Sequence, residues 1–175
     1  LDAKKLRYRN WDELMEYCIL SAAPVGRYLI DLHGGSSNEY APSDALCKAL
    51  QVINHLQDCK DDFKSLNRVY LPGDWLADAN VKVEELSQEI SSDGLRKVID
   101  SCLKETSVLM GEAIELPRKL KNRRLAMESA AIIEIAQQLI CRLGSADPLG
   151  VKRINLTKSE YFFSCTKGVV KSWFF

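Results

Sequence analysis

The chain has 175 residues, 46% of them hydrophobic, which suits one helical domain with a substantial core and excludes a disordered chain. Lysine plus arginine and aspartate plus glutamate number 24 each, which excludes the strongly basic composition of many nucleic-acid-binding proteins. The six cysteines form no C-x-x-C pair and no stretch is apolar enough to span a bilayer, so we expect reduced thiols and a cytoplasmic location.

The three-and-four spacing of apolar residues predicts helices over most of the chain. Asn10 is the expected N-cap of the first helix, and Pro24 is expected to kink it near Ala22–Ala23. The later helices are expected at residues 25–32, 42–66 and 81–89, from 93 to Pro117, and from there to 143. Loops are expected at 33–40 and 67–80, and the last stretch, 151–175, is less regular. With no strand-rich region, one all-α domain over residues 1–175 is the simplest interpretation.

The helix expected at residues 42–66 has a broad apolar side and a narrow polar stripe. The stripe consists of Gln51, Asn54, Asp58 and Asp62, at i, i+3, i+7 and i+11. Such a stripe is commonly a solvated face. However, Asn and Asp are poor mid-helix residues, and neighbouring aspartates repel one another, a cost that a bound cation would remove. Carboxylate and amide oxygens one turn apart suit Mg²⁺, which often shares its shell with substrate phosphate. The spacing by itself leaves both interpretations open.

Three segments resemble the squalene/phytoene synthase family. Residues 54–62, NHLQDCKDD, with RVYLP at 68–72, are similar to its second aspartate-rich motif, N-x-x-x-D-x-x-x-D followed by R-x-Y-L-P. Tyr17-Cys18 and SAAPVGR at 21–27 are similar to its Y-C and small-residue V-A-G-x-V-G segments. The Pro-Val-Gly-Arg version, with SDALC at 43–47, is most similar to the hydroxysqualene synthases of bacterial hopanoid pathways. Residues 147–153, DPLGVKR, are similar to the family's C-terminal basic segment.

The resemblance implies a class I isoprenoid-synthase helical bundle, of which these residues correspond to the C-terminal two-thirds without the N-terminal helices. It implies a Mg²⁺-dependent prenyltransferase that condenses two farnesyl diphosphates head to head into presqualene diphosphate, then hydroxysqualene or squalene. The implied roles are metal binding by Asn54, Asp58 and Asp62, catalytic contacts by Tyr17, Gln51 and Tyr70, and substrate binding by Ala22, Val25, Arg68 and Arg153.

Several of these residues also have a purely structural explanation. Tyr17 and Tyr70 are equally well explained as amphipathic core aromatics, and Arg153 as a surface cation. Arg27 suits either a helix cap or a phosphate contact. The histidines, His33 and His55, are most simply surface or loop residues.

The sequence departs from the family in one important respect. No D-x-x-x-D precedes Tyr17, so the family's first aspartate motif is not among these residues, and we expect little catalysis from them alone. We therefore expect a fragment of a longer enzyme. The alternatives are a non-catalytic member acting as an interaction or assembly protein, and a phytoene-type synthase using geranylgeranyl diphosphate.

Two further features bear on product and partners. No tyrosine occurs between Val81 and Arg153, where the family often has one, which puts the identity of the final product in doubt. The aromatic end of the chain comprises Tyr161, Phe162, Phe163, Trp173, Phe174 and Phe175, with Lys167 and Lys171 nearby. It suits either a peripheral position at the inner membrane or packing against other helices. The expected partner is a prenyl diphosphate, nucleic acid is not expected, and the oligomeric state is undetermined by sequence.

Overall fold

The computed structural model describes residues 5–173, which form helices and loops without a β-strand. Within this range the one β-type pairing is a parallel bridge between Tyr8 and Pro72. The helices are α1 (Trp11–Ser21), α2 (Ala23–Leu32), α3 (Tyr40–Gln57), α4 (Cys59–Leu66), α5 (Gly73–Asp78), α6 (Asp93–Ala113), α7 (Leu116–Lys119), α8 (Arg123–Ser145) and α9 (Lys158–Ser172), with 3₁₀ turns η1 (Ser37–Glu39) and η2 (Val83–Ser87). The all-α prediction is confirmed.

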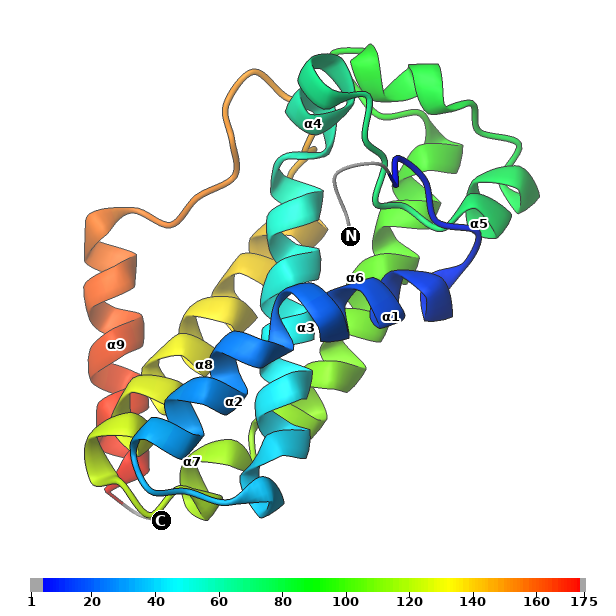
Figure 1. The fold of residues 1–175 in the computed structure, drawn as a ribbon. Coiled ribbons are helices and arrows are strands. Elements are labelled where there is room, and N and C mark those ends of the chain that lie inside the picture. The colour runs from blue at the N-terminus through cyan, green and yellow to red at the C-terminus, as the bar shows by residue number, and fades with distance from the viewer. Residues whose placement is uncertain (1–4, 174–175) are drawn as a thin grey trace.

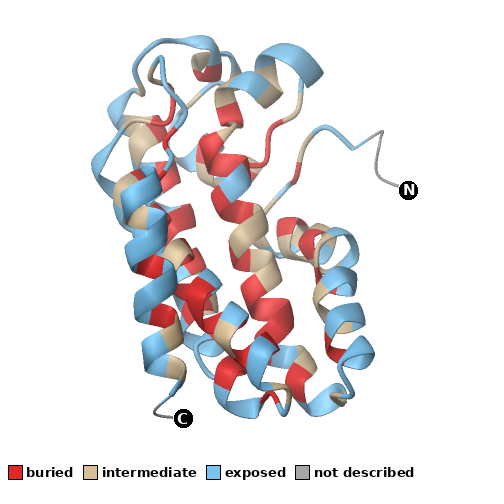
Figure 2. Cartoon of the chain, turned by 90° about the vertical axis from the view of Figure 1, so that its left-hand side faces the viewer, coloured by how far each residue is buried: buried red, intermediate tan, exposed pale blue. Residues whose placement is uncertain are grey.

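Helix α3 lies at the centre of the bundle. It contacts α1, α2, α6 and α8, and α9 lies along the outer side of α8 (Figure 1). The apolar side predicted for this helix supplies fully buried Ala45, Ala49, Val52 and Ile53 to the core. Figure 2 shows the buried residues gathered on the sides where the long helices face one another. The polar stripe is thus held on a helix whose other side is fixed by packing.

The predicted start and break of the first helix are confirmed. Asn10 caps α1, its side-chain oxygen accepting a hydrogen bond from the Glu13 amide at 3.0 Å. Helix α1 ends at Ser21 and α2 begins at Ala23, with Pro24 in the first turn of α2. Proline is tolerated there because the first turn needs no intrahelical N–H donor, whereas inside a longer helix its ring would clash with a carbonyl.

The prediction of a single helix at residues 42–66 was wrong. The helical stretch begins earlier, at Tyr40, and divides at Asp58, whose backbone (φ −107°, ψ 6°) leaves the helical region. The helical hydrogen bonds on either side persist: the Asp58 amide donates to Asn54 O at 3.0 Å, and the Asp62 amide donates to Asp58 O at 2.8 Å. These two hydrogen bonds keep Asn54, Asp58 and Asp62 one turn apart across the division. Asn67, in the left-handed region (φ 52°), ends α4.

Three other elements differ from the prediction. The loop predicted at 67–80 contains α5, a helix too short for its periodicity to be recognised. The helix predicted at 81–89 is instead the 3₁₀ turn η2. The stretch predicted to be irregular contains α9, which begins with a capping box between Thr157 and Glu160.

Helix α9 is attached to α8 by a close approach and by a buried carboxylate. Glu134 of α8 is buried and is contacted by the ammonium groups of Lys167, at 2.8 Å, and Lys171. Gly168 lies between the two lysines and packs directly on the backbone of α8. Lys167 and Lys171, which lie near the aromatic end in the sequence, therefore form ion pairs with Glu134.

Two phenylalanines of α9 and its C-cap residue, Trp173, are largely exposed. Phe162 and Phe163 are 68% and 69% exposed, and Trp173 is 66% exposed. Phe174 and Phe175 lie outside the described residues. Over residues 5–173, no helix combines the length and apolarity that crossing a bilayer requires.

Candidate functional site

The predicted polar stripe lies at the junction of α3 and α4. Asn54 is exposed, whereas Gln51, Asp58 and Asp62 are half-buried. Helical hydrogen bonds link Asn54 to Asp58 and Asp58 to Asp62, so the three predicted metal ligands follow one another at single-turn intervals. Residues four apart on helical backbone lie close together, and the two hydrogen bonds keep that spacing although Asp58 itself leaves the helical region.

Arg153 contacts two of these three residues. Its Nε donates to Asp58 Oδ1, and its Nη2 donates at 2.9 Å both to Asp58 Oδ2 and to Asn54 Oδ1. The Asp58 carboxylate raises the pKa of the Arg153 guanidinium through this hydrogen bond. The structure therefore brings the predicted substrate-binding arginine onto the predicted metal ligands, from the loop between α8 and α9.

Asp62 has no such cationic partner on its carboxylate among the ion pairs of the described residues. Partial burial, and then the nearby charge of Asp58, raise its pKa, while Arg68 acts in the opposite direction. An acid held ionised at such a position costs stability that a cation would recover. The repulsion by Asp58 is the cost that the sequence pattern indicated, whereas the larger effect of burial was not predicted.

The donors of the stripe fit part of a magnesium shell. Asn54, Asp58 and Asp62 offer amide and carboxylate oxygens, which hard cations prefer, and Mg²⁺ commonly completes its shell with water and phosphate oxygens. Within residues 5–173, no three Asp, Glu, His or Cys side chains converge closely enough to hold a metal by themselves. The stripe can therefore hold one side of a metal whose other ligands come from a diphosphate, water or other groups.

A cluster of aromatic rings lies beside the stripe. Tyr17 and Tyr70 are stacked with ring centroids 5.9 Å apart, and Tyr8 lies 5.2 Å from Tyr17 and 5.7 Å from Tyr70. Arg68 Nη1 donates to the Tyr70 hydroxyl at 3.3 Å. Gln51 Nε2 lies 3.5 Å from the Tyr17 hydroxyl. Four predicted site residues from three segments of the chain thus meet in one cluster.

His55 belongs to this cluster, and its predicted surface position was wrong. The ring is 6% exposed and stacks on Tyr70 with 3.4 Å between centroids and 6° between planes. Gln51 lies 3.1 Å from Nε2, and Nδ1 is buried without a hydrogen-bond partner among residues 5–173. Burial lowers the pKa of His55 to about 4, so the ring is neutral at neutral pH. Helical position indicated neither the burial nor the stack, because Tyr70 approaches from the loop after α4.

Val25, a predicted substrate-binding residue in α2, lies beside the N-terminal half of α3. Val25 and Gly26 line a pocket of about 220 Å³ between α2, α3, α7 and α8, whereas Ala22 is half-buried at the α1–α2 junction and does not line it. Arg27 donates to both carboxylate oxygens of Asp44, one at 2.9 Å, so in this structure it ties α2 to α3. The pocket is mostly apolar; besides Val25 and Gly26, its lining includes Leu46, Leu50, Leu125 and Ile132.

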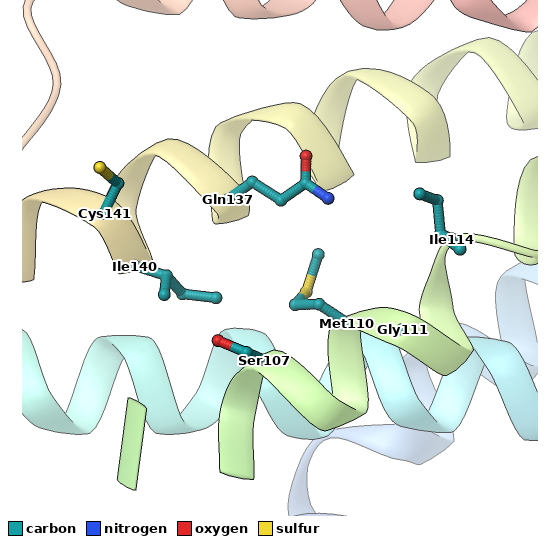
Figure 3. A pocket seen from close by; sticks show the side chains of 7 residues that line it. All are labelled: Ser107, Met110, Gly111, Ile114, Gln137, Ile140 and Cys141. Atoms are coloured by element: carbon teal, nitrogen blue, oxygen red, sulfur yellow. The ribbon is translucent and has the colours of Figure 1, made fainter. Parts of the chain in front are cut away.

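A second pocket, of about 370 Å³, lies between α6 and α8. Met110 and Gln137 point toward each other across it, with Cys141 at one end (Figure 3). No predicted site residue lines this pocket.

Comparison with known proteins identifies the family. Residues 1–160 match squalene/phytoene synthase. The chain belongs to the squalene/phytoene synthase family. A family member from Rhodopseudomonas palustris, a hydroxysqualene synthase, is 43% identical over 161 residues, covering 92% of this chain and 55% of that protein. A phytoene synthase from Thermus thermophilus is 32% identical over 131 residues, covering 75% of this chain and 45% of that protein. The chain thus spans about half the length of the curated relatives that it matches.

Solved structures of the family agree with the fold. The crystal structure of squalene synthase HpnC from Alicyclobacillus acidocaldarius superposes with a TM-score of 0.74 at 30% identity, over 80% of this chain and 53% of that one. A dehydrosqualene synthase in complex with ligand gives a TM-score of 0.88 over 100% of this chain and 62% of that one. At 18% identity, this second likeness shows the fold alone. The predicted isoprenoid-synthase bundle is confirmed for the part of the family fold that these residues form.

Proposed function

We propose that the chain carries the second aspartate-motif side of a Mg²⁺-dependent prenyltransferase, which condenses two farnesyl diphosphates head to head toward hydroxysqualene. The observation that carries this proposal is the convergence of Asn54, Asp58 and Arg153 at one point. Two metal-type oxygen donors and one phosphate-type donor meet there across about a hundred residues of sequence.

Asn54, Asp58 and Asp62 would hold the metal, which when bound supplies a Lewis acid for the charge that develops on a leaving diphosphate. Arg153 and Arg68 have the guanidinium geometry that recognises phosphate oxygens through paired N–H donors.

The aromatic cluster would form the part of the site next to the metal ligands. The hydroxyl groups of Tyr17 and Tyr70, which contact Gln51 and Arg68, would lie at the diphosphate end of the site. Gln51, which contacts both Tyr17 and His55, would orient these rings. The apolar pocket that includes Val25 would receive part of a prenyl chain.

The hydroxysqualene branch is favoured over the phytoene branch by similarity. The Rhodopseudomonas palustris hydroxysqualene synthase matches over more of this chain, at 43% identity, than the Thermus thermophilus phytoene synthase does at 32%.

A chimaera tests the proposal, since these residues lack the first aspartate motif. The matching 161 residues of the Rhodopseudomonas palustris enzyme would be replaced by this chain and incubated with farnesyl diphosphate and Mg²⁺. We expect hydroxysqualene among the extracted lipids, and loss of product in Asp58→Asn and Asp62→Asn variants. A folded chimaera that makes no head-to-head product while the parent enzyme does would overturn the proposal. Phytoene from geranylgeranyl diphosphate would reassign the substrate.

We also propose that the exposed aromatic face of α9 lies at a membrane surface, where a lipid product would leave. The exposure of Phe162, Phe163 and Trp173 supports this proposal. Helices that lie at a membrane interface insert aromatic side chains of this kind into the headgroup region. Co-sedimentation with vesicles of phosphatidylglycerol and phosphatidylethanolamine would test this. Binding that persists unchanged in the Phe162→Ser, Phe163→Ser double variant would contradict it.

A further inference from the structure

Arg153 occupies a cation's position on the stripe. Its guanidinium spans one helical turn: Nη2 contacts both Asn54 Oδ1 and Asp58 Oδ2, and Nε contacts Asp58 Oδ1. Its remaining nitrogen, Nη1, donates to Asn155 Oδ1 at 3.0 Å. These are the same oxygen atoms that a metal ion would use, so the guanidinium and a metal in direct contact with them compete for their lone pairs.

The loop carrying Arg153 does not depend on this contact for its position. Ile154 and Leu156, on either side of Asn155, are buried in the core. Gln57 Nε2 donates to the Ile154 carbonyl, and Arg142 donates to the Asn155 carbonyl at 2.8 Å. The backbone next to Arg153 is thus anchored by other groups. The Arg153 side chain is 39% exposed and can turn about its own bonds once its hydrogen bonds to Asp58, Asn54 and Asn155 are exchanged for others.

We propose that Arg153 is a positioning residue that holds Asn54 and Asp58 in place before the metal arrives and moves from them to the diphosphate when metal and diphosphate bind together. This inference rests on the proposed function, since it assumes that the stripe binds a metal.

The geometry has a thermodynamic consequence. A metal ion arriving alone must displace a bidentate, charge-assisted pair and leaves the guanidinium without its partner. When diphosphate arrives with the metal, the guanidinium gains phosphate oxygens in exchange for the carboxylate oxygens it loses. Arg153 therefore weakens binding of the metal alone and strengthens its binding with diphosphate, which is a positive coupling between the two ligands.

The test measures Mn²⁺ binding to the whole chain by electron paramagnetic resonance, with and without inorganic pyrophosphate. The variants are Arg153→Gln, Arg153→Lys and Lys152→Gln. Lys152→Gln removes one positive charge from the neighbouring exposed residue and so controls for net charge. The double variant Asp58→Asn, Asp62→Asn measures Mn²⁺ held elsewhere on the surface, and far-UV circular dichroism checks that every variant is folded.

We expect Arg153→Gln to bind Mn²⁺ alone about three- to tenfold more tightly than the wild type, and to lose most of the enhancement by pyrophosphate. Lys152→Gln should stay within about twofold of the wild type in both measurements. Arg153→Lys should regain part of the pyrophosphate enhancement, because it keeps the charge but not the fork of donors.

Two results would overturn the inference, and they are distinguishable. If Arg153→Gln behaves as Lys152→Gln does while the wild type binds Mn²⁺ through Asp58 and Asp62, Arg153 does not compete with the metal, and the proposed function stands. If the wild type binds no more Mn²⁺ than the double variant, with or without pyrophosphate, the metal role of the stripe fails together with this inference.

Discussion

Gly168 of α9 lies against Ala130 of α8 so closely that a Cβ on residue 168 would stand 2.5 Å from the Ala130 carbonyl oxygen. The same Cβ would stand 2.5 Å from the Cα of Ala131. The obstacles are backbone atoms, which cannot turn aside as a side chain could. This contact sets how deeply α9 can pack on α8, and with it where the lysines that contact Glu134 are placed.

Gly168→Ala should therefore destabilise the chain, by about 1–3 kcal/mol, because α9 must move away from α8. Urea denaturation followed by circular dichroism would measure the loss. Gly144→Ala is the matched control: Gly144 is also helical, and apart from the nearby backbone of its own helix a Cβ there meets no atom of residues 5–173 within 4 Å. That control should gain up to about 1 kcal/mol from helix propensity. Equal effects of the two variants would contradict the close approach.

Glu134→Gln should destabilise the chain at neutral pH by about 1–3 kcal/mol, since it leaves two lysines facing an uncharged group. Burial opposes ionisation of Glu134, but hydrogen bonds from Lys167 and Lys171 prevail and lower its pKa below 4.5. An acid with a lowered folded-state pKa stabilises above its unfolded pKa and loses that contribution as pH falls through the folded value. The difference in unfolding free energy between wild type and variant should hence shrink below about pH 4.5, as urea melts at several pH values would show. A difference independent of pH would contradict ionisation of Glu134.

Asp62→Asn should abolish Mn²⁺–pyrophosphate binding without destabilising the fold. The pKa of Asp62 is raised by partial burial and by Asp58, so its charge is unfavourable in the folded chain at neutral pH. We expect a gain of about 0.5 kcal/mol on neutralisation, after allowance for solvent screening. Asp61→Asn, at an exposed position, is the control and should change neither property appreciably. A clear loss of stability in Asp62→Asn would show that the residue has a structural role instead.

His55→Phe should make the fold less sensitive to acid. In the folded chain His55 stays neutral until about pH 4 because it is buried, while in the unfolded chain it accepts a proton near pH 6.5. Protonation thus favours unfolding, and stability falls as pH drops from 6.5 to 4. The wild type should lose up to about 3 kcal/mol more than His55→Phe over this range, in buffer with a metal chelator. His33→Gln removes an exposed histidine as a control. Parallel pH profiles of wild type and His55→Phe would refute the buried, neutral ring.

Sequence determined the features that depend on residues near one another along the chain. The apolar spacing predicted the helical bundle, Asn10 predicted the start of α1, and Pro24 predicted the break before α2. The spacing of Asn54, Asp58 and Asp62 gave the stripe, because helical hydrogen bonds link residues four apart whatever the rest of the fold does. The short helix α5 escaped prediction, since six residues show too little periodicity.

Only the tertiary structure decided which distant groups meet at that stripe. Arg153 reaches Asp58 because the burial of Ile154 and Leu156 holds their loop beside the junction of α3 and α4. His55 is buried because Tyr70, from the loop after α4, covers its ring. Helical periodicity states which face a side chain occupies but not what packs on that face. The stripe was therefore readable from the sequence, while the arginine that contacts it and the rings beside it depended on long-range packing of the loops.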